Sequence, residues 1–97
     1  MTITKTQEND TLTLNLQGRL DTTTAPQLEG ELGALDGVKN LVLDFEGLEY
    51  ISSAGLRVLL KAQKQMNSQG GMVIRNVCAD INEVFEITGF SDILTVE

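Results

Sequence analysis

The chain has 97 residues, of which 41% are hydrophobic and 22% charged, with one proline, so the composition is that of a single globular domain and not of a disordered or fibrous chain. Its 14 acidic and 7 basic side chains give a formal net charge of -7, which disfavours direct binding to nucleic acid or to an anionic membrane surface. The single cysteine excludes an internal disulfide and no apolar run is long enough to span a membrane, so we expect a cytoplasmic domain over residues 1–97.

The first third of the chain predicts a hairpin followed by a helix. Residues 3–5 and 12–16 alternate apolar and polar side chains, and the polar turn Glu8-Asn9-Asp10 lies between them. Thr22-Thr23-Thr24 and Pro26 then mark the start of a helix. The helical spacing of three leucines predicts that this helix runs for about three turns, through Leu28, Leu32 and Leu35.

The rest of the chain repeats a strand followed by a helix. The apolar run Leu41–Phe45 predicts a strand covered on both faces, and a helix follows from Ser52 or Ser53 to Gly70-Gly71. Met72–Ile74 predicts a short strand. A helix follows over residues 81–88 and is ended by Gly89, and Ile93–Val96 predicts a last strand. The order β-β-α-β-α-β-α-β predicts an α/β fold, with three helices on a mixed, mostly parallel sheet of about five short strands.

The residues favour a binding module over an enzyme. The chain contains no histidine, the commonest general base and metal ligand, so we expect neither a catalytic triad nor a metal site. It contains neither a P-loop nor a dinucleotide-binding motif, so we expect no cofactor. Cys78 has only Arg75 as a nearby cation in the sequence, and we interpret it as a structural thiol.

Two serines stand where the central helix is predicted to begin. In the simplest interpretation, one hydroxyl caps the free amide groups of the first turn. A cap accounts for one serine, however, and not for a second, exposed hydroxyl. A phosphate added to Ser53 would meet the free amides and the positive end of the helix dipole, so phosphorylation there is compatible with an intact helix.

Three of the seven basic residues, Arg57, Lys61 and Lys64, follow at the spacing i, i+4, i+7 on one face of the same helix. One interpretation is a solvated helix face whose aliphatic stems cover apolar neighbours. The other is that this face and the serine loop form a docking surface for another protein. In that case Arg57 can pair with a phosphate on Ser53, four residues earlier.

At these residues the chain resembles the STAS-domain family, specifically the bacterial anti-sigma-factor antagonists. The similar segments follow one another in the family order over nearly the whole chain, at 18–21 (Gly-Arg-Leu-Asp), 41–45, 50–56 (Tyr-Ile-Ser-Ser-Ala-Gly-Leu) and 85–90. In the family pattern Asp-Ser-Ser/Thr-Gly-Leu, the phosphoacceptor is the serine after the aspartate, which corresponds to Ser53. Two positions differ from this pattern, because Ser52 replaces the aspartate and Ala54 follows the acceptor.

The resemblance implies a partner-switching regulator. Its unmodified form would bind an anti-sigma factor that is also a serine kinase, so that the sigma factor is released. Phosphorylation at Ser53 would reverse this binding, and a phosphatase would reset it. The resemblance and the residues together predict a partner-binding surface formed by Asp21, Thr22, Ser52, Ser53, Ala54, Gly55, Leu56 and Arg57. For Asp21 the residues leave a second interpretation open, in which it ends a strand and orders the turn.

Two other roles also stay open. Small STAS-like proteins occur as accessory subunits of membrane transporters or of lipid-trafficking ABC complexes. A third role is a small-molecule or nucleotide sensor that uses the helix N-terminus as an anion site, which the net charge of -7 disfavours. The sequence identifies neither the sigma factor nor the oligomeric state.

Overall fold

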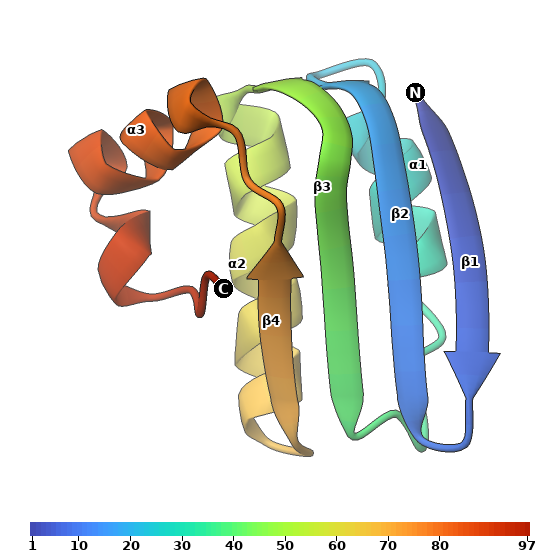
Figure 1. Cartoon of the computed structure of the whole chain (residues 1–97). Coiled ribbons are helices and arrows are strands. Elements are labelled where there is room, and N and C mark those ends of the chain that lie inside the picture. Colours follow the sequence, from blue (N-terminus) through green and yellow to red (C-terminus); the bar gives the residue numbers. More distant parts are fainter.

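Four strands form one mixed sheet in the computed structural model, which describes residues 1–97 (Figure 1). In spatial order they are β1 (Thr2–Glu8), β2 (Thr11–Leu20), β3 (Asn40–Ile51) and β4 (Gly71–Arg75). β1 pairs antiparallel with β2, and β2, β3 and β4 run parallel to one another. The hairpin, the parallel strands and the α/β class predicted from the sequence are therefore confirmed, with four strands in place of about five.

The helices are α1 (Ala25–Glu31), α2 (Ser53–Asn67) and α3 (Ala79–Thr88), followed by a 3₁₀ turn over Phe90–Asp92. α1 and α2 cover one face of the sheet, and α3 lies beyond the edge formed by β4 (Figure 1). No helix combines the length and the apolar character that crossing a lipid bilayer requires.

The hydrophobic core lies between the sheet and the helices. β2 alternates as a half-covered strand should, because its leucines are buried while Asn15 and Gln17 are exposed. The side chains with less than 2% exposure include Phe85 of α3, Leu59 of α2 and residues of both central strands, among them Leu12, Leu14, Leu16, Leu20, Leu41, Leu43, Phe45 and Leu48.

The predicted last strand is the main difference from the sequence-based fold. Residues Ile93–Val96 form no strand, and only Val96 makes a single parallel bridge, to Ile74. The reason is local: the Phe90 carbonyl accepts hydrogen bonds from the amides of Ile93 and Leu94, at 3.0 and 2.8 Å. Backbone donors that a strand would use are thus engaged in the 3₁₀ turn.

Three smaller predictions also need correction. α1 has 7 residues, so it is shorter than predicted, and Leu35 is buried beyond its end. β3 is longer than predicted, because it continues through a register irregularity near Glu46 to Ile51. Cys78 is exposed at the N-cap position of α3, so its side chain is not part of the core.

Candidate functional site

The carboxyl-terminal ends of β2 and β3 bring two predicted parts of the site together. Because these strands are parallel and adjacent, the loops that follow them meet at one edge of the sheet, at the top of Figure 1. The backbone N–H of Ser52 donates to the Leu20 carbonyl at 2.9 Å. The serine loop is therefore tied to the residue that directly precedes Asp21.

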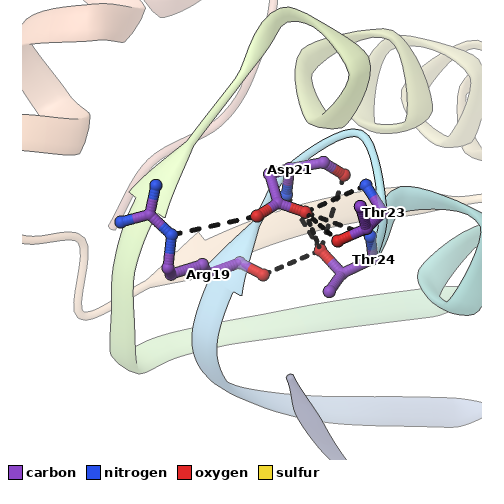
Figure 2. A network of polar contacts seen from close by, with 4 residues as sticks. All are labelled: Arg19, Asp21, Thr23 and Thr24. Carbon is purple, nitrogen blue, oxygen red and sulfur yellow. Dashed lines mark hydrogen bonds and ion pairs between the residues drawn. The ribbon is translucent and has the colours of Figure 1, made fainter.

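The loop after β2 is ordered by the carboxylate of Asp21 (Figure 2). Its Oδ1 accepts hydrogen bonds from the Thr23 hydroxyl at 2.7 Å, the Thr23 amide at 3.0 Å and the Thr24 amide at 3.2 Å. The Thr24 hydroxyl accepts from the Asp21 amide at 2.8 Å and donates to the Arg19 carbonyl at 2.7 Å. The hydrogen bonds that the carboxylate accepts, above all that from the Thr23 hydroxyl, lower the pKa of Asp21. The interpretation that Asp21 orders the turn is confirmed, and Thr22 lies exposed at its tip.

Ser53 is the first residue of α2, and its side chain is exposed. The first intrahelical bond runs from the Leu56 amide to the Ser52 carbonyl at 3.0 Å, so the preceding amides of the turn have no acceptor within the helix. The first turn carries no acidic side chain. An anion at Ser53 would therefore face free amides and the positive helix end without a like charge in that turn.

The prediction that a serine hydroxyl caps α2 is wrong, because no serine side chain makes the capping hydrogen bond. Ser52 occupies the N-cap position with an extended backbone, at φ -106° and ψ 176°, but its side chain makes no capping hydrogen bond. Its Oγ is buried and has no hydrogen-bond partner. A buried hydroxyl without a partner typically costs about 1–3 kcal/mol, so this atom destabilises the fold where a cap would stabilise it.

Replacing Ser52 by alanine should accordingly leave the free energy of unfolding unchanged or raise it by up to about 1 kcal/mol. Loss of a true serine cap would instead lower it by about 1 kcal/mol. Urea denaturation of Ser52→Ala and of the exposed neighbour variant Ser53→Ala distinguishes the two cases. A clear loss of stability in Ser52→Ala alone would show that the hydroxyl caps the helix in solution.

Of the predicted residues after Ser53, some are buried against the sheet and others lie at the surface. Gly55 and Leu56 are buried, and a Cβ added at Gly55 would lie 2.7 Å from Leu20 Cγ and 2.9 Å from Ile51 Cγ1. These two residues therefore seat α2 closely against the ends of β2 and β3. Both are buried in the free chain, and their role in partner binding stays a prediction.

Three other predicted residues, Thr22, Ala54 and Arg57, line a groove of about 340 Å³ between α1 and α2. Lys61 lies along the same groove, and its Nζ is 3.1 Å from Oε1 of Glu29 on α1. This part of the basic stripe thus joins the two helices. Arg57 makes no ion pair, so its charge remains available at the surface.

Sequence reasoning missed a pair formed by Arg19 and Tyr50. The two residues are partners in the parallel register of β2 and β3, and the guanidinium carbon lies 4.1 Å from the centroid of the ring. Both residues stand in segments that carry the family resemblance, but nothing in the sequence fixes the register that makes them neighbours. The pair lies at the ends of β2 and β3, just before the loops that form the candidate site.

Comparisons with known proteins place the chain in a family. A family model for the STAS domain matches residues 2–97. BtrV of Bordetella bronchiseptica, assigned by name as an anti-sigma factor antagonist, is 46% identical over 84 residues, which cover 84% of this chain and 72% of BtrV.

Solved structures share the fold. An anti-sigma factor antagonist from Mycobacterium paratuberculosis has a TM-score of 0.88 at 23% identity, over 98% of this chain and 83% of that one. The anti-sigma factor antagonist SpoIIAA in its unphosphorylated form has a TM-score of 0.78 at 18% identity, over 99% of this chain and 87% of that one. Bacillus SpoIIAA in its phosphorylated form has a TM-score of 0.77 at 18% identity, over 99% of this chain and 91% of that one. With a family match over nearly its whole length, this chain belongs to the STAS-domain family.

Proposed function

We propose that this chain is an anti-sigma-factor antagonist, a binding protein of the cytoplasm without catalytic activity of its own. The unmodified chain binds an anti-sigma factor that is also a serine kinase, and the sigma factor is released. Phosphorylation at Ser53 ends this binding, and a phosphatase restores it. The observation that carries the proposal is the exposed Ser53 hydroxyl at the first position of α2, beside the ordered loop that begins at Asp21. The likeness to BtrV supports it.

Charge and desolvation are sufficient to operate this switch. A partner docked at the end of the sheet covers the Ser53 hydroxyl, and a phosphate there adds about -1.5 to -2 charges at neutral pH. A single guanidinium offsets only part of this charge, and burying the rest costs several kcal/mol, while about 1.4 kcal/mol changes an affinity tenfold. The complex can therefore dissociate without a large rearrangement of either protein.

The free chain can hold the same phosphate without unfolding. The first turn of α2 contains no carboxylate to repel it, and Arg57 lies one turn further along, exposed and without an ion pair. In the proposed switch the Arg57 guanidinium pairs with the phosphate on Ser53. SpoIIAA has been solved with and without phosphate, and both forms share the fold of this chain.

Incubation with ATP and the serine-kinase anti-sigma factor of the same organism tests the proposal. Intact-mass measurement should show one phosphate on the wild-type chain and on Ser52→Ala, and none on Ser53→Ala.

In the phosphorylated sample, Arg57→Ala should raise the second pKa of the phosphate in phosphorus NMR, because the guanidinium favours the dianion. A phosphate that persists in Ser53→Ala would place the acceptor elsewhere. Co-purification of a permease or its ATPase in place of an anti-sigma factor would favour the accessory-subunit role.

A further inference from the structure

Arg19 and Tyr50 form an exposed pair at the ends of β2 and β3. The Arg19 side chain is 60% exposed and Tyr50 is 40% exposed. Tyr50 is one of only four large hydrophobic residues that the chain exposes, and the guanidinium stacks on its ring. Tyrosine and arginine are enriched among the few residues that dominate the binding energy of protein interfaces.

The guanidinium is held in place while its outer edge stays free. Nε of Arg19 lies 3.8 Å from Oδ2 of Asp21, whose other oxygen is engaged by Thr23 and Thr24. Figure 2 shows the two terminal nitrogens of Arg19 pointing away from Asp21. No hydrogen bond or ion pair within the chain engages them. This planar fork of donors matches a carboxylate in geometry as well as in charge.

The pair lies on the opposite side of the sheet from α2. Leu20 and Ile51, the next residue on each strand, are buried against α2 near Gly55, so the alternating side chains of Arg19 and Tyr50 face away from that helix. Tyr50 nevertheless stands only three residues before Ser53. The two features flank the same end of the sheet.

The small size of the molecule allows one partner to contact both features. The Cα trace extends over only 32 × 27 × 20 Å. A standard protein interface buries about 800 Å² on each partner. The accessible surface of the chain is 5348 Å², so an interface of this size centred on Ser53 covers about a seventh of it and includes Arg19 and Tyr50 where it extends across the end of the sheet.

We propose that Arg19 binds a carboxylate side chain of the protein that docks at Ser53, with the Tyr50 ring as the apolar wall of this contact. Asp21 acts as a positioning residue for the guanidinium. The net charge of -7 repels an acidic segment from most of the surface, whereas Arg19 and Arg57 attract it to the two flanks of this end. The inference rests on the proposed function for the identity of the partner, and it assigns a recognition element outside the serine loop.

Titration calorimetry with the purified anti-sigma factor tests this assignment. Arg19→Gln and Tyr50→Ala should each weaken binding roughly tenfold or more. Lys39→Gln, which removes one positive charge just before the opposite end of β3, is the matched control and should leave the affinity near that of the wild type. Binding by Arg19→Gln should also depend less steeply on salt, because one close charge pair is gone.

A charge exchange separates recognition from folding. Arg19→Glu should abolish binding, and replacing one acidic residue of the anti-sigma factor by arginine should restore it. Wild-type affinity in both Arg19→Gln and Tyr50→Ala, with Ser53→Asp still weakening the complex, would overturn this inference and leave the proposed function standing. Absence of binding by the unmodified wild-type chain would overturn both. A thermal unfolding midpoint of Arg19→Gln far below that of Lys39→Gln, without rescue by any exchanged acidic residue, would show that Arg19 is structural and contradict the inference.

Discussion

Ser53→Asp should weaken the binding of the anti-sigma factor by roughly ten- to a hundredfold, whereas Ser53→Ala should still bind and can no longer be modified. The aspartate brings one full charge to a position that the partner covers, and each 1.4 kcal/mol of uncompensated desolvation lowers the affinity about tenfold. Alanine removes a hydroxyl that makes no hydrogen bond within the chain, so it leaves no buried partner unsatisfied. Titration calorimetry with the purified partner measures both affinities.

The control for this comparison is a variant with the same added charge at another place. Ser91 is exposed in the 3₁₀ turn after α3, away from the end of the sheet that carries Ser53 (Figure 1). Ser91→Asp should therefore bind like the wild type, apart from a small electrostatic change that salt screens. Equal affinities for Ser53→Asp and Ser53→Ala would mean that the partner does not cover this hydroxyl, and the proposed switch would be wrong.

The elements that the sequence predicted well are those set by local chemistry. The period-two leucines of β2 and the polar turn before them specify the hairpin, and Gly89 ends α3 in the left-handed conformation, at φ 81°. α2 begins at Ser53, one of the two serines at which the sequence predicted its start. An amphipathic pattern of 15 residues leaves little freedom in where the helix begins.

The errors arose where features other than side-chain periodicity decide the structure. The apolar run Ile93–Val96 has the composition of a strand, yet the 3₁₀ turn that starts at Phe90 takes its first amides. A serine hydroxyl was predicted to cap α2, but Oγ of Ser52 at the N-cap position is buried and makes no hydrogen bond. The neighbouring pair Arg19 and Tyr50 depends on the register between two strands that are far apart in the sequence. Periodicity carries no information on these three features.

Substitution of Gly55 should disturb both the fold and the site. A Cβ at this position would lie 2.7 Å from Leu20 Cγ and 2.9 Å from Ile51 Cγ1, and both side chains are buried. Overpacking of this kind typically costs about 1–3 kcal/mol. Relief of the clash requires the start of α2 to move away from the sheet, and Ser53 stands at that start.

The substitution Gly30→Ala in α1 provides the matched comparison, because a Cβ there meets no atom within 4 Å and the residue is exposed. It should raise the free energy of unfolding by about 0.5–1 kcal/mol, the usual gain of alanine over glycine in a helix. Gly55→Ala receives the same gain but loses more to the clash, so we expect a net loss of about 1–2 kcal/mol in urea denaturation. Phosphorylation at Ser53 should slow in Gly55→Ala and not in Gly30→Ala. If both alanines stabilise the chain equally, α2 is not held against the sheet as tightly as the structure places it, and the fixed geometry of the serine loop loses its physical basis.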